Sequence, residues 1–173
     1  MTLLRRACYD TARFFMSVRI TTIIENDVAD VVSLMRGFAE YENLSEYCTV
    51  TEERLSAAMF GDSSIIEGLI AFADDVAIAY ALFYPSFSSF RGERGLFLED
   101  IYITEEYRRH NLGEEMLREI ARIAKQRGCE RIDFHVLDWN TPAVKFYLKH
   151  GADRNDDERH FKLAGEAFEN LAC

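Results

Sequence analysis

A short basic segment combines backbone donors and positive charge that suit a phosphate group. It reads Tyr107-Arg108-Arg109-His110-Asn111-Leu112-Gly113 and stands between an apolar stretch and an amphipathic one. A turn between a strand and a helix exposes unpaired backbone N–H groups at the positive end of the helix dipole, which favours a pyrophosphate. Arg108 and Arg109 add countercharge. Asn111 tolerates a left-handed backbone, and Gly113 lets a ligand approach the first helical turn. The alternative is an ordinary connection with a solvated arginine pair.

Two adjacent carboxylates, Glu99 and Asp100, interrupt an otherwise apolar segment over residues 95–103. A strand that is apolar on both faces is typical of the inside of a sheet, where a carboxylate needs a cation, a hydrogen-bond donor or water. Successive side chains of a strand point to opposite faces, so we expect the two carboxylates to face different sides. The alternative is that structural arginine or lysine side chains hold both.

A tyrosine and an asparagine belong to a helix that the sequence predicts over residues 140–149. Asn140 is a typical N-cap residue. Tyr147 lies four residues after Ala143, on the apolar face, which turns it toward the sheet. Since a buried tyrosine usually packs and finds a hydrogen bond, its position alone does not indicate chemistry.

The elements that must position these residues alternate between strands and helices. Apolar residues at helical spacing, from Val28 to Phe38, follow the capping candidate Asn26. Ala73-Asp74-Asp75 separates two apolar runs as a hairpin turn does, and Gly128 suits a helix C-terminus. The predicted strands are 18–24, 65–72, 76–83, 95–103, 131–137 and 160–163, and the predicted helices are 26–38, 51–60, 112–126 and 140–149.

Length and charge restrict the classes of partner. The 173 residues, 49% of them hydrophobic, predict one domain over residues 16–173, preceded by an extension of unknown role over 1–15. With 30 acidic and 20 basic residues, the net charge of −10 argues against nucleic acid and anionic membrane surfaces. It favours cationic ligands such as polyamines, diamines and basic amino acids, although solubility alone also explains an acidic chain.

The cysteines and histidines show no metal-ligand spacing and no nucleophile elbow, so we expect no metal site and no covalent catalysis. The scattered cysteines are typical of reduced thiols, and no apolar run approaches the roughly 20 residues of a membrane span. These features predict a cytoplasmic protein. The residues concerned are Cys8, Cys48, Cys129, Cys173, His110, His135, His150 and His160.

The basic segment resembles the acetyl-CoA loop of the GNAT acetyltransferase superfamily, whose pattern is Arg or Gln, two variable residues, Gly, one variable residue, then Gly or Ala. Arg108 and Gly113 match its ends, and Asn111 stands where the family usually has Gly. The resemblance extends from about Val18 to the C-terminus and points to the diamine (spermidine/spermine and thialysine) acetyltransferase branch. The blocks that carry it are Leu98-Glu99-Asp100-Ile101-Tyr102-Ile103, Asp138-Trp139-Asn140-Thr141-Pro142-Ala143 and Phe146-Tyr147-Leu148-Lys149-His150-Gly151-Ala152.

This resemblance implies an α/β (α+β) fold of the GNAT type, a mixed and mainly antiparallel sheet with flanking helices and a splayed acetyl-CoA cleft. It implies that Glu99 accepts the proton of the amine through water and that Tyr147 protonates the CoA thiolate. It assigns the amine to Tyr41, Glu42, Glu99 and Asp100. Acetyl-CoA as co-substrate is assigned to Ile101, Tyr102, Ile103, Arg108, Arg109, His110, Asn111, Leu112, Gly113, Glu114, Asn140, Ala143 and Lys149.

The function expected from the resemblance is acetyl-CoA-dependent N-acetylation of the primary amine of a small cationic substrate, by direct attack and without a metal. A homodimer is implied in the same way. Two alternatives stay open: acetylation of a protein or peptide amine, and a CoA-binding regulatory module without catalysis. The sequence leaves open which amine is the acceptor and whether Asn111 weakens acetyl-CoA binding.

Overall fold

The computed structural model describes residues 18–172, so the N-terminal extension of residues 1–15 lies outside the described part. The chain divides into two compact units, residues 1–135 and residues 136–173. The single domain predicted for residues 16–173 stays a prediction.

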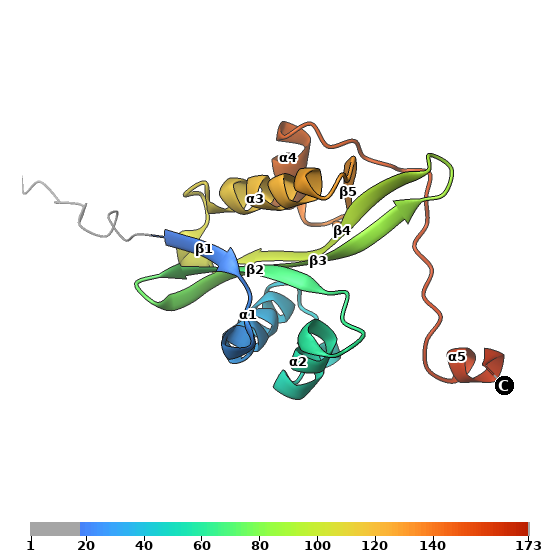
Figure 1. Cartoon of the computed structure of the whole chain (residues 1–173), viewed down its shortest axis with the longest axis horizontal. Helices are drawn as coiled ribbons and strands as arrows, with labels where there is room; N and C mark the ends of the chain where they lie inside the picture. The colour runs from blue at the N-terminus through green and yellow to red at the C-terminus, as the bar shows by residue number, and fades with distance from the viewer. Residues whose placement is uncertain (1–17, 173) are drawn as a thin grey trace, which may run out of the picture. The chain divides into compact units, whose positions relative to one another are not determined.

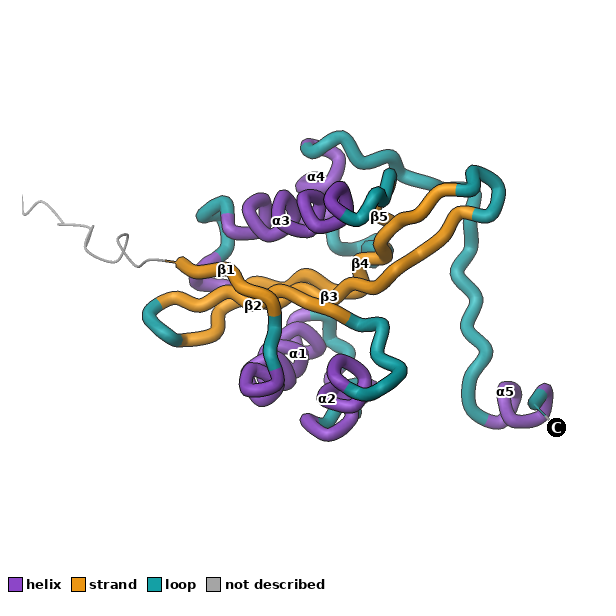
Figure 2. The backbone as a smooth tube through the Cα atoms, viewed as in Figure 1, coloured by secondary structure: helices purple, strands orange, loops and turns teal. Residues whose placement is uncertain are grey.

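The first unit is built on a sheet of five strands in the order β1-β2-β3-β4-β5. Neighbours pair antiparallel except for β4 and β5, which pair parallel. Asp74 and Asp75 adopt left-handed backbone and close a tight hairpin between β2 and β3, as their sequence predicts. The strands are β1 (Val18–Thr22), β2 (Glu67–Ala73), β3 (Val76–Ser88), β4 (Glu93–Ile103) and β5 (Arg131–Phe134). Figure 2 shows the long hairpin that β3 and β4 form.

Helices cover both faces of this sheet. Figure 1 shows α3 (Leu112–Gln126) on one face, and α1 (Val28–Tyr41) with α2 (Glu52–Phe60) on the other. The core on the α3 side includes Met116, Ile120 and Leu98, and the core on the α1 side includes Val31, Tyr80 and Leu82. Short 3-10 turns connect the elements: η2 (Glu25–Asp27), η3 (Ser45–Tyr47) and η4 (Glu105–Tyr107). The alternating apolar positions of β3 therefore supply two cores.

Capping residues mark the start of α2 and the end of α3 in the first unit. The Thr51 hydroxyl accepts the Arg54 backbone N–H at 3.3 Å and starts α2. Gly128, with φ of +72°, ends α3. The prediction of Asn26 as the cap of the first helix is wrong. Residues 25–27 form the turn η2 instead, stabilised by the Ile24 backbone N–H donating to the Asp27 carboxylate at 2.9 Å.

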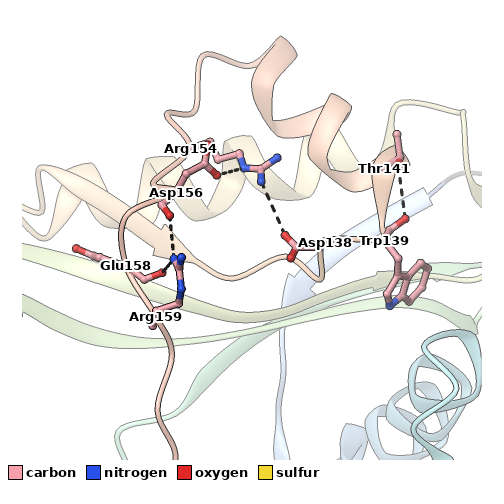
Figure 3. A network of polar contacts seen from close by, with 7 residues as sticks. All are labelled: Asp138, Trp139, Thr141, Arg154, Asp156, Glu158 and Arg159. Atoms are coloured by element: carbon pink, nitrogen blue, oxygen red, sulfur yellow. Dashed lines mark hydrogen bonds and ion pairs between the residues drawn. The ribbon is translucent and has the colours of Figure 1, made fainter.

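The second unit holds α4 (Thr141–Lys149) and α5 (Glu166–Leu171). Exposed polar contacts precede and follow α4 (Figure 3): Arg154 contacts Asp138 at 3.9 Å and also Asp156, and Arg159 donates to the Asp156 carbonyl oxygen at 3.0 Å. The predicted strand over residues 160–163 is wrong. Its backbone pairs with no strand among residues 136–172, and the Phe161 side chain is 89% exposed. A strand needs a neighbour for its hydrogen bonds, and this unit provides none in its described residues.

Candidate active site

A bulge in β4 places the two adjacent carboxylates. Leu98 pairs with Phe83 and Asp100 pairs with Leu82, so Glu99 is an extra residue without a partner on β3. Leu98 and Ile101 both join the core on the α3 side, which leaves Glu99 and Asp100 on the opposite side. The prediction that they face different sides is therefore wrong, because a bulge interrupts the alternation of side chains at this point.

A cavity of about 570 Å³ lies on the α1 side of the sheet and contains both carboxylates. Glu42, the residue after α1, contributes a third carboxylate. The helices and η3 supply an apolar and aromatic wall. The lining residues are Met35, Phe38, Ala39, Glu42, Leu44, Tyr47, Cys48, Thr49, Val50, Arg54, Leu55, Ala58, Tyr80, Glu99 and Asp100.

Asp100 is held by a buried tyrosine. The Tyr80 hydroxyl donates to Asp100 Oδ2 at 2.9 Å, and Tyr80 is fully buried. Burial raises the pKa of Asp100 to about 6, and the charge of Glu99 adds to this rise, while the hydrogen bond from Tyr80 opposes it. Burial together with the charge of Asp100 raises the pKa of Tyr80 far above its usual range. The Tyr80 hydroxyl is therefore a permanent donor to Asp100.

The other two carboxylates differ in their surroundings. Glu99 is exposed, and its Oε2 accepts a hydrogen bond from the Tyr84 hydroxyl at 3.2 Å. Burial, followed by the charge of Asp100, raises the pKa of Glu42. Among residues 18–172, the direct partners of Glu99 and Asp100 are tyrosine hydroxyls. The alternative that arginine or lysine side chains hold both carboxylates is wrong.

The basic loop before α3 contains two left-handed residues, Arg109 with φ of +66° and Asn111 with φ of +64°. Asn111 precedes the first residue of α3, Leu112, as its tolerance of this backbone predicts. Arg109, His110 and Asn111 are exposed, and Gly113 lies in the first turn of the helix. Glu114 pairs with Arg118 one helical turn later. The loop thus presents backbone at a helix N-terminus, while its use by a phosphate stays a prediction.

Arg108 contacts the end of β4, while its predicted contact with a phosphate stays a prediction. Its Nε donates to the Ile103 carbonyl oxygen at 2.9 Å, and its guanidinium carbon lies 4.2 Å from the centre of the Tyr41 ring and 5.5 Å from that of Tyr102. Arg108 therefore attaches the loop to the end of β4. Tyr41 stacks on Arg108 and is not among the residues that line the cavity, so its contact with the substrate stays a prediction.

One edge of β4 is open next to the carboxylates. The partner β5 pairs only with residues 95–98, so residues 99–103, including Ile101, Tyr102 and Ile103, extend beyond its last residue, Phe134. The strand predicted to reach Leu137 is thus shorter than expected. The end of this pairing at Leu98 is consistent with a splay between the two strands, while use of residues 99–103 by an extended ligand stays a prediction.

The remaining predicted site residues lie in the second unit. Asn140 Oδ1 accepts the Ala143 backbone N–H at 3.3 Å and caps α4, as expected. Tyr147 is the buried residue of α4, with 8% of its surface exposed, and its ring contacts that of Phe146 edge to face. Lys149 is the last residue of α4. Their approach to the carboxylates of the first unit stays a prediction.

Sequence reasoning missed two residues that line the cavity, Tyr80 and Arg54, and it missed Tyr84, whose hydroxyl donates to Glu99. Tyr80 is a polar-tipped side chain inside an aliphatic strand, and such a residue usually has a buried partner. Arg54 had a weaker signal, because it shares the first turn of α2 with the cap residue Thr51. Cys48 also lines the cavity and is a free thiol. Cys129 is a free thiol as well, and Cys8 and Cys173 lie outside the described residues.

Residues 18–172 contain no cluster of three or more His, Cys, Asp or Glu side chains placed to hold a metal ion. No helix in this part of the chain combines the length and apolarity needed to cross a membrane.

Comparison with known proteins decides the family. The model of the Acetyltransferase (GNAT) family matches residues 33–152. This chain belongs to the GNAT acetyltransferase family. It is also 34% identical over 166 residues to the thialysine N-epsilon-acetyltransferase of Bos taurus, covering 90% of this chain and 97% of that protein. The resemblance and the N-acetyltransferase class read from the sequence are therefore confirmed.

Other members of the GNAT family agree with this assignment. Spermidine/spermine N(1)-acetyltransferase-like protein 1 of Homo sapiens is 29% identical over 133 residues, which are 73% of this chain and 19% of that protein. The aminoglycoside N-acetyltransferase AAC(6')-Iy, solved in complex with CoA, superposes with a TM-score of 0.68 at 15% identity, covering 85% of this chain and 95% of that one. The structural likeness confirms the predicted GNAT-type fold.

Proposed function

We propose that this GNAT acetyltransferase transfers the acetyl group of acetyl-CoA to the primary amine of a small cationic substrate bound in the acidic cavity. The observation that carries the proposal is the convergence of Glu42, Glu99 and Asp100 on one cavity that also has aromatic walls. Ionised carboxylates that lie close together repel one another, and a cation that binds between them stabilises their ionised forms. An aliphatic ammonium ion meets both requirements, because it supplies the charge and its methylene groups fit the apolar wall.

Deprotonation of the amine is the first task of the site. An aliphatic amine with a pKa near 10 is mostly charged at neutral pH and has no lone pair for attack. We assign proton acceptance to Glu99, through a water molecule, because it is the exposed carboxylate beside the open edge of β4. Asp100 and Glu42 hold the remaining positive charge of the substrate.

The acetyl group then passes directly from CoA to the amine, without an acyl-enzyme. The nitrogen of the amine forms a bond to the carbonyl carbon of the thioester, the carbon–sulfur bond breaks, and the electron pair leaves with sulfur as the CoA thiolate. Tyr147 gives its phenolic proton to this thiolate, while Glu99 carries the proton that the ammonium group loses before attack. The second proton, which the nitrogen loses as the amide forms, restores the Tyr147 phenol through solvent. Backbone N–H groups of β4 polarise the thioester carbonyl as negative charge develops.

Two parts of acetyl-CoA need a binding site on the protein, the pantetheine arm and the pyrophosphate. The open edge over residues 99–103 offers backbone groups to the amides of the pantetheine arm, as an added strand would use them. The loop from Arg109 to Gly113 offers backbone N–H groups to the pyrophosphate at the start of α3. Asn140, Ala143 and Lys149 are the proposed contacts from the second unit.

The named relatives support a small amine as acceptor, since they are a thialysine and a spermidine/spermine-like acetyltransferase. We also propose the homodimer implied by the resemblance, which light scattering during gel filtration tests through the mass of the particle. A particle with the mass of a single 20.0 kDa chain would contradict it.

The test of the function is release of CoA by the purified protein from acetyl-CoA and a panel of amines. The panel contains spermidine, spermine, putrescine, thialysine, lysine and a lysine-containing peptide. We expect turnover with small amines and a fall in kcat of about 100-fold in Tyr147→Phe, within the range of general acid–base effects. Phe146→Leu, at the neighbouring position of α4, is the control for packing.

Other outcomes separate the alternatives. Turnover of the peptide alone would move the function to acetylation of protein amines. Binding of acetyl-CoA without turnover of any amine would support a regulatory module. Full activity of Tyr147→Phe would remove Tyr147 as the acid while leaving the substrate class intact.

A further inference from the structure

One cation belongs to the lining of the acidic cavity, and the function proposed above gives it no task. Besides Glu42, Glu99 and Asp100, the only charged residue of the described segment 18–172 that lines this cavity is Arg54. Arg54 stands in the first turn of α2, whereas two of the carboxylates come from β4 and the third follows α1. The cavity therefore carries opposite charges on different elements.

Within the described part of the chain, the Arg54 side chain uses one hydrogen-bond donor. Its Nη1 donates to the Thr49 carbonyl oxygen at 3.2 Å, which orients the guanidinium group from the segment just before α2. A guanidinium group has five N–H donors in a planar fork, so this one bond leaves donors available for a carboxylate, which it can bind through two parallel hydrogen bonds. The side chain is exposed, so a ligand entering the cavity can reach it.

Arg54 has no carboxylate of its own to neutralise it among the described residues. Arg127 shows the opposite case, because it contacts both oxygens of Glu67 at 2.5 and 2.6 Å. Arg54 forms no such pair with any carboxylate among residues 18–172. Glu52 and Glu53 share its helical turn but do not line the cavity.

We propose that Arg54 binds the carboxylate of the acceptor substrate, which is a diamino acid acetylated on its side-chain amine. This inference rests on the proposed function, since it takes the amine to lie at Glu99. With the carboxylate on Arg54 and the distal amine at the carboxylates of β4, the aliphatic chain lies along the apolar wall that includes Phe38 and Leu55. The α-amino group stays beside the substrate carboxylate and is not acetylated.

The consequence is discrimination between molecules that differ only in one carboxylate. A diamine of the same length offers Arg54 a methylene or ammonium group, so it leaves the guanidinium without a partner. Arg54 is then a residue that determines specificity, and its effect belongs in KM for the acceptor more than in kcat, because it binds a part of the substrate that does not react.

The experiment uses two matched pairs, lysine with cadaverine and ornithine with putrescine, at saturating acetyl-CoA. For each pair we measure the ratio of kcat/KM of the amino acid to that of the diamine. We expect a ratio of at least about 10 for the natural protein, because only the amino acid forms the charge-assisted bidentate contact with Arg54. In Arg54→Gln the ratio falls at least about tenfold through a higher KM for the amino acid, and kcat/KM for the diamine rises as a positive charge is removed.

Two variants control the result. Arg36→Gln removes the same charge from an exposed position of α1 that does not line the cavity, and its ratio stays at the natural value. Arg54→Lys keeps the charge without the planar fork and gives an intermediate ratio. Mass spectrometry of acetylated lysine locates the acetyl group, which we expect on the side-chain nitrogen.

The outcomes separate this inference from the proposed function. If the protein acetylates no amine at all, the proposed function fails. If it acetylates amines but the ratio is the same in the natural protein, Arg54→Gln and Arg36→Gln, the function stands and the role of Arg54 is overturned. Acetylation on the α-amino group would overturn it as well, because the substrate would then lie in the opposite direction.

Discussion

Asp100 lowers the free energy of unfolding at neutral pH, yet its carboxylate favours the binding of a cationic ligand. Burial and the charge of Glu99 raise its pKa from 3.8 to about 6. Between these two values the folded protein binds more protons than the unfolded chain does, so the free energy of unfolding falls as the pH rises through this window. A bound ammonium group reverses the effect by stabilising the ionised form.

Replacing Asp100 therefore has a pH-dependent effect on stability. We expect Asp100→Asn, without a ligand, to be more stable than the natural protein at pH 7, by up to about 3 kcal/mol, since one pKa unit corresponds to about 1.4 kcal/mol. The advantage shrinks toward pH 4, where the aspartate is protonated. Urea unfolding at both pH values measures the difference. An equal difference at both would contradict the raised pKa of Asp100.

Tyr80 acts on the same carboxylate from the buried side. Its hydrogen bond lowers the pKa of Asp100, so loss of the hydroxyl in Tyr80→Phe should raise that pKa further above 6. The rise in amine affinity that follows ionisation of Asp100 then moves to higher pH. The dependence of KM on pH, measured for one diamine, gives its midpoint. Tyr84→Phe, which loses a donor to Glu99 instead, is the matched variant, and a midpoint unchanged in Tyr80→Phe would count against the role of Tyr80.

At the scale of elements, the bulge in β4 decides how the site is composed. If the residues from Leu98 to Ile101 alternated regularly, without a bulge at Glu99, Asp100 would meet the core on the α3 side and Ile101 would leave that core. With the bulge, Leu98 and Ile101 both stay in that core while two consecutive carboxylates face the cavity. The same strand thus serves packing and ligand binding at once.

The start of α3 depends on the left-handed residue Asn111, with φ of +64°. Asparagine adopts this backbone more easily than residues with a plain Cβ, and glycine does so more easily still. We expect Asn111→Ala to lower the free energy of unfolding by about 1 kcal/mol and Asn111→Gly to leave it unchanged or raise it slightly. Urea unfolding of the two variants tests this. Equal stability of both would show that the backbone at Asn111 relaxes in the alanine variant.

Charge acts at the scale of the whole molecule. A net charge of −10 attracts a cationic amine and repels acetyl-CoA, which is an anion. Added salt screens both effects, since the Debye length falls from about 10 Å at 0.1 M to about 3 Å at 1 M. We expect kcat/KM for a diamine to fall several-fold between low and high salt, while KM for acetyl-CoA falls or stays constant. Steady-state rates against sodium chloride give both values, and a parallel loss for both substrates would indicate a general effect of salt on the enzyme.

Much of the fold could be predicted from local sequence, because the relevant physics is local. The signals that succeeded each act within a few residues and mark elements that the structure contains. They are the apolar spacing of α1 and α3, the hydroxyl of Thr51, the amide of Asn140 and the glycine after α3. The strand predicted over 160–163 failed for the opposite reason, since a strand depends on a partner that may lie anywhere in the chain.

The sequence by itself determined the family, the acidic character of the chain and the two adjacent carboxylates on an apolar strand. Only the tertiary structure decided that Glu99 is a bulge, that Tyr80 donates to Asp100, that Arg108 stacks on Tyr41, and that Arg54 shares a cavity with residues more than 40 positions away. The physical reason is that strand register and side-chain contacts between distant segments depend on how whole elements pack. No local pattern around any of these residues contains that information.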